Sequence, residues 1–319
     1  MIVVYTIAFM KSRTKSATLG MILCIRMKKS TLNIFKMHGW RVDRAIHNYV
    51  YFVFYEQYVR SFLAAGRLLV NRFGSSPPVS LAFRKVYENY HAKVLTFNDA
   101  RKILTLNHDV RIDDDTAKKI IPFSAANKII FSQPDFIAVM DCPCRLSRKQ
   151  HCKPVNVCMA VGRTTAEFWL EHCAQFHVRK ITQAEALDLL QESVSLNRII
   201  AAWLKTETGG RTGVICSCCS CCCGGIEGMK LARKLKSKDK VTNIVSSGYS
   251  VRIGRGVCVS CGTCVQVCAF DACQPVEGGS PLYDVEACLG CGVCTSKCPS
   301  GARTLVRDES KGLPLDVDL

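Results

Sequence analysis

The hydrophobic pattern of the first 73 residues predicts two segments of different character. Residues 1–44 carry short apolar runs between basic residues, and no run reaches the roughly 20 residues that a membrane-spanning helix needs. We interpret this part as a basic, disordered leader. Residues 45–73 are rich in aromatic side chains, and Gln57, Arg60 and Arg67 recur among them at helical spacing as one polar stripe. This pattern predicts an amphipathic helix that packs on the protein's own core, or alternatively against a membrane surface or a partner subunit.

The pattern of residues 74–227 predicts a mostly helical domain that is rich in cysteine. Capping boxes at Thr164 and Thr182 are each followed three residues later by a glutamate, so that side chains satisfy otherwise unpaired amides of a first helical turn. Apolar residues follow Thr182 at helical spacing. The apolar run before Cys142 predicts a strand or another buried segment. Residues 228–247 contain a dense group of lysines and arginines, which we interpret as a basic linker.

The cysteine content changes this picture. The chain has 319 residues and 21 cysteines, while 48% of its residues are hydrophobic and 22% are charged, which is typical of a globular protein. Most of the cysteines are concentrated in residues 142–158, 216–223 and 258–298. Neighbouring cysteines pair poorly in disulfides, because a bridge requires Cα atoms about 4.4–6.8 Å apart. Since the chain also shows no secretory signal pattern, this clustering favours metal ligation over disulfides.

The charge of the chain narrows the choice of partners. The formal net charge is +17, and the excess of basic residues lies upstream of residue 252. A basic protein can bind nucleic acid, an anionic membrane or an acidic partner. No zinc-finger, helix-turn-helix or RNA-binding pattern accompanies the charge, so we expect no nucleic acid partner. We expect a cytoplasmic protein, or one held peripherally on the cytoplasmic face of a membrane through residues 45–73.

From Cys258 onward the sequence repeats itself with a period of 30 residues. Both repeats fit the spacing C-x2-C-x2-C-x3-C. The first contains Cys258, Cys261, Cys264 and Cys268, and the second contains Cys288, Cys291, Cys294 and Cys298. Three closely spaced cysteines on a tight loop can wrap one face of an iron–sulfur cube, and the fourth then ligates the other cluster. A pair of zinc sites with four cysteines each is the alternative.

This repeat resembles the bacterial two-cluster ferredoxins over residues 248–307. The resemblance implies two [4Fe–4S] clusters and a ferredoxin-like (βαβ)2 fold, with strands at residues 250–255 and 302–308. It implies that cluster I is bound by Cys258, Cys261, Cys264 and Cys298, and cluster II by Cys288, Cys291, Cys294 and Cys268. The chain departs from the family in having Ala269 where a proline usually follows the fourth cysteine. The predicted fold class is therefore α+β, with a mostly helical domain followed by this module and by a tail over residues 308–319.

Ten further cysteines lie upstream of the repeat in two groups. One group has the spacing C-x-C-x7-C-x5-C and consists of Cys142, Cys144, Cys152 and Cys158. We expect it to bind a third iron–sulfur cluster, with zinc as the alternative, and we expect the nearby Arg145 and Arg148 to favour thiolates. The other group consists of Cys216, Cys218, Cys219, Cys221, Cys222 and Cys223. Adjacent cysteines cannot all face one metal, so we expect a subset to complete a third or fourth cluster and the rest to join the first group. A flexible loop that holds one zinc ion is the alternative.

These patterns favour an iron–sulfur electron-transfer protein of an anaerobe. It would relay single electrons between redox partners, as a carrier or as a subunit of an oxidoreductase complex. One alternative is a redox enzyme subunit that reduces a disulfide or another small substrate at residues 216–223, and another is a scaffold that delivers clusters or metal. We assign no catalytic residues, because the sequence shows no nucleotide-binding loop, catalytic triad pattern or credible acid–base pair.

Overall fold

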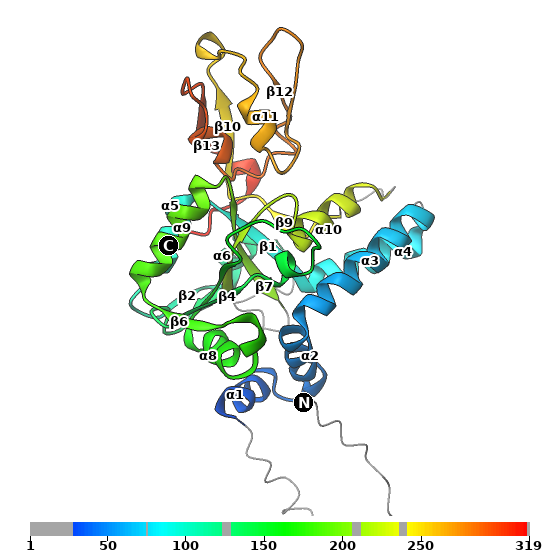
Figure 1. The fold of residues 1–319 in the computed structure, drawn as a ribbon, viewed down its shortest axis with the longest axis vertical. Coiled ribbons are helices and arrows are strands. Elements are labelled where there is room, and N and C mark those ends of the chain that lie inside the picture. Colours follow the sequence, from blue (N-terminus) through cyan, green and yellow to red (C-terminus); the bar gives the residue numbers. More distant parts are fainter. Residues whose placement is uncertain (1–27, 75, 123–128, 206–211, 236–240, 318–319) are drawn as a thin grey trace, which may run out of the picture.

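The computed structural model describes residues 28–74, 76–122, 129–205, 212–235 and 241–317 (Figure 1). Residues 1–27 of the predicted leader lie outside these ranges. The rest of the leader forms helix α1 (Lys29–His38) and the start of α2 (Val42–Val53).

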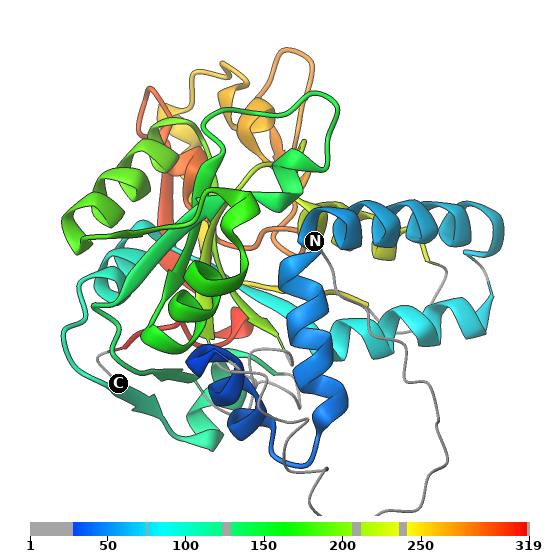
Figure 2. The same ribbon diagram turned by 60° about the horizontal axis from the view of Figure 1, so that its bottom comes forward.

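The aromatic segment that was predicted as one helix forms two. α2 ends at Val53, and α3 (Tyr55–Phe73) begins two residues later. α3 and α4 (Pro77–Asn89) project side by side from the rest of the molecule (Figure 2). The buried residues of α3 recur at helical spacing and are Tyr55, Val59, Leu63, Gly66 and Val70. They pack against α10 (Gly224–Arg233) and the central core, so this helix lies on the protein's own core, as one of the two interpretations predicted. Among the described residues, no helix is both long and apolar enough to cross a bilayer.

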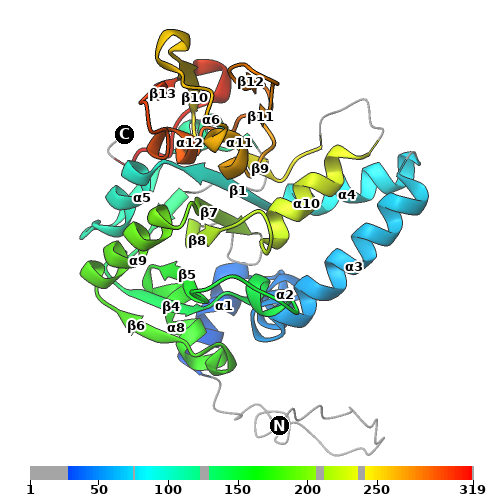
Figure 3. The ribbon, with the colours of Figure 1, turned by 45° about the horizontal axis from the view of Figure 1, so that its top comes forward.

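A seven-stranded sheet forms the centre of the middle domain (Figures 1 and 3). In spatial order its strands are β6 (Arg179–Ile181), β4 (Ile137–Asp141), β5 (Asn156–Val161), β8 (Thr212–Cys218), β7 (Ile199–Lys205), β1 (Tyr90–Leu95) and β9 (Ile244–Val245). All neighbouring strands are antiparallel except β1 and β9. The mixed content agrees with the predicted α+β class, but the hydrophobic pattern did not predict this sheet. The reason is that a strand buried on both faces is continuously apolar and lacks the alternation that identifies a half-buried strand.

The remaining elements are short. The helices are α5 (Phe97–Leu104), α6 (Asp114–Ile120), α7 (Pro143–Leu146), α8 (Arg163–His172), α9 (Gln183–Ser195), α11 (Thr263–Val267) and α12 (Val293–Ser296). The strands are β2 (Val110–Ile112), β3 (Ile129–Phe131), β10 (Tyr249–Ile253), β11 (Cys273–Gln274), β12 (Leu282–Tyr283) and β13 (Arg303–Arg307). The Thr182 half of the predicted capping box is confirmed, because its hydroxyl accepts a hydrogen bond from the Glu185 amide at 3.2 Å, while the Glu185 carboxylate pairs with Arg179. The predicted cap at Thr164 is wrong, since α8 begins earlier, with Gly162 as its N-cap.

Helices cover both faces of the sheet and create two hydrophobic cores. Successive residues of β4 alternate between them: Ala138 and Met140 belong to the first core, whereas Ile137 and Val139 belong to the second. The first core includes residues of α1, α2, α3, α8 and α10, together with Cys173 and six cysteines of the two upstream groups. The second includes residues of α5, α6 and α9. The upstream cysteines therefore lie on the side of the sheet that the aromatic helices cover.

The ferredoxin-like module lies at one end of the sheet domain (Figure 1). Its elements follow in the order β10, α11, β11, β12, α12 and β13, which is the order of two βαβ halves. β10 pairs with β13 and β11 with β12, both antiparallel. Ala269, Phe270 and Val293 of the module belong to the first core of the sheet domain. The module is thus packed onto the sheet domain instead of being joined only by a linker.

The segment after β13 folds back onto the sheet domain. Leu315 and Val317 are buried in the second core. The buried Lys93 Nζ donates hydrogen bonds to the carbonyl oxygens of Ile120 at 3.0 Å and Leu313 at 2.6 Å, and Lys102 pairs with Asp316 at 2.8 Å. This segment therefore connects the module to the sheet a second time.

Replacing Leu315 by alanine should destabilise the protein. Its side chain is 0% exposed, and a buried Leu→Ala change costs about 2–5 kcal/mol. We expect a clear drop in the midpoint of thermal unfolding of anaerobically purified protein, followed by circular dichroism. Leu282→Ala is the control, because Leu282 is 62% exposed and should shift the midpoint little. Equal shifts for the two variants would show that the segment does not contribute to the core.

Candidate metal centres

Four cysteines from both halves of the repeat line one cavity of the module. They are Cys258, Cys261, Cys264 and Cys298. The first three lie on or next to the loop that leads into α11, and Cys298 follows α12 in the second half. This is the set that the ferredoxin resemblance implies for cluster I, with the fourth cysteine contributed by the opposite half.

The other four cysteines of the repeat line a second cavity. They are Cys268, Cys288, Cys291 and Cys294. The loop before α12 depends on glycine, because Gly290 has a φ of 64° and a Cβ there would lie 2.2 Å from the carbonyl oxygen of Tyr249. A fifth sulfur, that of Cys273, borders the cavity and accepts a hydrogen bond from Arg303 Nη1 at 3.3 Å. Four thiols around each of two small cavities are the donor set that [4Fe–4S] clusters require.

The cysteines of the two cavities differ in their exposure to solvent. Cys261 is exposed, and a hydrogen bond with the Thr263 hydroxyl holds the pKa of its thiol below the usual value. In the second cavity Cys288 is buried, and burial raises the pKa of Cys291 to about 12. Cys268 and Cys291 also pack against the first core of the sheet domain. The first cavity is therefore accessible to another protein, while the second faces the inside of the molecule.

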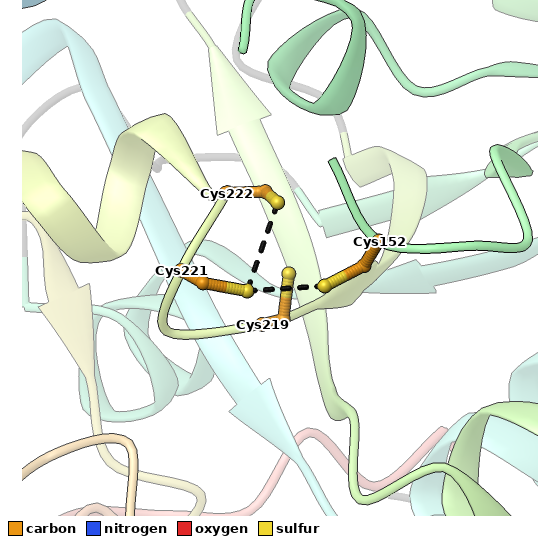
Figure 4. A group of neighbouring side chains, drawn as sticks. All are labelled: Cys152, Cys219, Cys221 and Cys222. Carbon is orange, nitrogen blue, oxygen red and sulfur yellow. Dashed lines mark hydrogen bonds between the residues drawn. The ribbon is translucent and has the colours of Figure 1, made fainter. Parts of the chain in front are cut away.

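The upstream cysteines form two groups that do not follow their order in the sequence. The compact group consists of Cys152, Cys219, Cys221 and Cys222 (Figure 4). Cys152 lies between α7 and β5, and the others lie on the turn between β8 and α10. The Sγ atoms of Cys152 and Cys221 are 3.1 Å apart, and those of Cys221 and Cys222 are 3.7 Å apart. Cys221 is exposed, so this group reaches the surface.

The spacing of the compact group suits a single metal ion. All four sulfurs lie within 4.8 Å of one another. A tetrahedral ion with metal–sulfur bonds of about 2.3 Å places its sulfurs about 3.8 Å apart. A cube holds its cysteine sulfurs farther apart, because each of them binds a different iron atom. In the described parts of the chain, no other cysteine group brings three sulfurs this close together.

The six-sulfur group lies deeper, next to the compact group. It consists of Cys142, Cys144, Cys158, Cys216, Cys218 and Cys223, and all six are buried. They border one cavity that also touches Cys219 and Cys222. β5 pairs with β8 so that Cys158 lies directly opposite Cys216, and their Sγ atoms are 3.7 Å apart. Cys223 is the N-cap of α10. The structure thus joins three cysteines of each predicted group and separates Cys152 from its sequence neighbours.

Arg145 lies between the two groups. It is 1% exposed, its Nη1 donates to the carbonyl oxygen of Pro154, and its Nη2 donates to that of Ser217 at 3.0 Å. Among the residues that the structure describes, it forms no ion pair with a carboxylate. Burial lowers the pKa of Arg145. Negative charge on the nearby Cys142 and Cys219 raises it, and together the charges of the surrounding cysteines outweigh burial, so the pKa lies above its usual value. A buried cation needs a negative partner, and the cysteines around Arg145 would supply it when they bind metal as thiolates.

Aromatic residues that were not predicted to belong to the site cover the six-sulfur group. Tyr55, Tyr90 and Trp203 line its cavity. Gly225 allows this packing, because a Cβ there would lie 1.9 Å from Cη2 of Trp203. The sequence signal for this aromatic cover was the helical spacing of Tyr51, Tyr55 and Tyr58. By itself that spacing indicated only an apolar helix face.

Comparison with known proteins identifies the module. The family described as "4Fe-4S dicluster domain" matches residues 257–303. These residues form a 4Fe–4S dicluster domain. The two four-cysteine cavities lie within this domain.

Three similar proteins are named as subunits of larger enzymes. A subunit of the Na(+)-translocating ferredoxin:NAD(+) oxidoreductase complex of Acetobacterium woodii is 43% identical over 63 residues, 20% of this chain and 19% of that protein. A subunit of the tetrathionate reductase of Archaeoglobus fulgidus is 43% identical over 49 residues, 15% of this chain and 24% of that protein. A subunit of the pyruvate synthase of Methanocaldococcus jannaschii, PorD, is 40% identical over 52 residues, 16% of this chain and 60% of that protein. The chain therefore spans less than two thirds of the length of each relative.

Proposed function

We propose that this protein relays single electrons between redox partners as the iron–sulfur subunit of an oxidoreductase complex. The observation that carries the proposal is the order of the centres from solvent to core. The cavity with the exposed Cys261 comes first, and the cavity of Cys268 and Cys291 packs against the core that contains the six-sulfur group. The names of two relatives, a subunit of an oxidoreductase complex and a subunit of a reductase, support the same role.

In this proposal the dicluster domain holds two clusters. Cluster I is held by Cys258, Cys261, Cys264 and Cys298, and cluster II by Cys288, Cys291, Cys294 and Cys268. Each cluster supplies a one-electron couple when bound. The chain itself supplies the thiolates, buries Cys288 of cluster II and places the buried Arg303 beside the sulfur of Cys273 at that cavity, where its charge offsets that of the thiolates.

The upstream groups extend the path into the sheet domain. We assign a further iron–sulfur cluster to the six-sulfur group, and a single tetrahedral ion, iron or zinc, to the compact group. Arg145 would offset the negative charge of both. A redox partner would approach cluster I, where Val257 and Val259 are 56% and 64% exposed. We also propose a cytoplasmic location. A contact between α3 and a membrane or a partner subunit is a separate proposal, and the exposed side chains of Leu68 and Phe73 support it.

Metal analysis of the anaerobically purified full-length protein tests this proposal. The dicluster domain accounts for about eight irons per chain. We expect about four or more in addition from the six-sulfur group, and one further iron or zinc from the compact group. Acid-labile sulfide and the EPR spectrum of the reduced protein should rise in parallel with iron. About eight irons and no more would remove the upstream centres from the proposal, and a colourless protein that holds only zinc would overturn all of it.

A second candidate function is the reduction of a small molecule at the six-sulfur group. A cavity of about 520 Å³ favours it, because this cavity reaches Cys144 from the surface of the helical layer. A pure electron carrier needs no such space beside its metal centre.

A further inference from the structure

We propose that this cavity is the binding site for a small organic anion with a flat aromatic or apolar body. The assignment of that anion as a substrate rests on the second candidate function above, whereas its binding does not. The evidence consists of the position of the cavity, the charge at its exposed side and the side chains of its walls.

The cavity connects the molecular surface with the six-sulfur group. It lies between α2, α3, α4 and α10, and its volume is within the range of about 300–1,000 Å³ that is usual for small-molecule sites. Its buried side is formed by Val59, Leu63, Gly224 and Cys144. A Cβ on Gly224 would lie 3.1 Å from Cγ1 of Val59 and 3.6 Å from Sγ of Cys144. A glycine at this position therefore leaves space beside the sulfur.

The exposed side of the cavity is basic. Arg41, Arg44 and Lys85 line it, and Asp43 is the one carboxylate among the lining residues that the structure describes. Asp43 pairs with Arg41 at 2.7 Å, and Arg41 holds the pKa of Asp43 at about 2. Asp43 therefore compensates Arg41, and Arg44 adds a positive charge at the surface end of the cavity. Guanidinium groups bind carboxylates and sulfonates through paired, charge-assisted hydrogen bonds.

The walls between these two ends are aromatic. Tyr51, Tyr58, Phe62, Tyr87 and Tyr90 contribute to them. The rings of Tyr51 and Tyr58 meet edge to face at 5.0 Å, and those of Tyr58 and Phe62 lie parallel at 6.4 Å. Ordered aromatic walls bind a flat apolar body by stacking and edge contacts. A ligand of this class would place its charged group at the arginines and its body toward Cys144.

The test uses a pair of probes that differ in charge but share an aromatic body. 8-Anilinonaphthalene-1-sulfonate is the anion, and N-phenyl-1-naphthylamine is its neutral counterpart. Each is titrated into anaerobically purified full-length protein by calorimetry, which does not depend on cluster colour. We expect the anion to bind at one site per chain and the neutral probe to bind at least about tenfold more weakly, as expected for the loss of one charge-assisted contact.

Charge variants locate the site. Arg41→Gln combined with Arg44→Gln should weaken binding of the anion at least about tenfold and leave the neutral probe unchanged. Arg72→Gln is the matched control, because Arg72 is an exposed arginine of α3 that does not line the cavity. Circular dichroism verifies that the variants are folded. An absent or non-saturable heat signal, equal affinity for both probes, or an equal loss in the Arg72 variant would overturn the proposal.

Spectroscopy separates this proposal from the second candidate function. If the anion lies beside Cys144, its addition should alter the EPR signal of the upstream cluster and leave the dicluster signals unchanged. If calorimetry detects binding of the anion to protein that holds only the iron of the dicluster domain, the anion site is supported, but the anion is not a substrate of an upstream cluster. A protein with upstream iron but without anion binding would remove the anion site and retain the electron relay.

Discussion

Replacing Cys258 and Cys298 together by alanine is expected to abolish one [4Fe–4S] cluster and leave the other intact. These two cysteines come from opposite halves of the repeat but line the same cavity. Removing both leaves that cavity with two thiols, too few to hold a cube, while the four thiols of the second cavity are untouched. Iron should fall by about four per chain, and the EPR spectrum of the reduced protein should retain one unperturbed dicluster signal.

The reciprocal double variant decides how the fourth cysteines are exchanged. Cys288 and Cys298 belong to the same half of the repeat but line different cavities. Their joint replacement leaves each cavity with three of its four assigned thiols, so neither can hold a cube with its assigned ligands. We expect neither native dicluster signal to remain. If this variant instead kept one native signal and the Cys258/Cys298 variant kept none, each half would bind its own cluster.

Cys273 provides the control for these variants. Its sulfur borders the second cavity as a fifth thiol and accepts a hydrogen bond from Arg303. Cys273→Ala should therefore retain all dicluster iron and both signals. A loss of iron equal to that of a cluster ligand would show that Cys273 replaces one of the four assigned thiols.

The second large effect is expected from Arg145→Leu. The substitution removes a buried positive charge that lies between two groups of thiolates, and removing one partner of a buried charge pair costs about 3–5 kcal/mol. The thiolates would become uncompensated, and metal centres with net negative charge would be held more weakly. We expect iron and zinc upstream of the dicluster domain to be lost in purified protein, with the dicluster EPR signals unchanged.

Two further variants separate charge from packing. Arg145→Lys keeps the positive charge but loses part of the hydrogen bonding to Pro154 and Ser217, so it should retain more upstream metal than the leucine variant. Arg101→Leu removes an exposed arginine of α5 and should leave the metal content unchanged. Full upstream metal in Arg145→Leu would show that the thiolates need no buried counter-charge.

The fold could be predicted where its signals were local. The α9 cap at Thr182 and the apolar face of α3 each depend on residues within a few turns of one helix, whereas the β10 and β13 strands were predicted from the ferredoxin resemblance. The central sheet could not be predicted in this way. β4 sends Ala138 and Met140 to one core and Ile137 and Val139 to the other, so both faces are apolar and the strand carries no alternating pattern. The break at Phe54 was also missed, because helical periodicity continues across it.

The repeated C-x2-C-x2-C-x3-C spacing was enough to indicate the dicluster domain, because each copy of the motif lies in one short stretch of chain. It was also enough to indicate that the ten upstream thiols suit metal better than disulfides. The division of those ten cysteines into the compact group and the six-sulfur group became visible only in the folded chain. Cys152 meets Cys221 across 69 residues of chain, and Cys158 faces Cys216 because β5 pairs with β8 in one register. The basic, aromatic cavity beside Cys144 likewise exists only where α2, α3, α4 and α10 pack together. Contacts between distant segments depend on strand register and helix packing, and no local spacing encodes them.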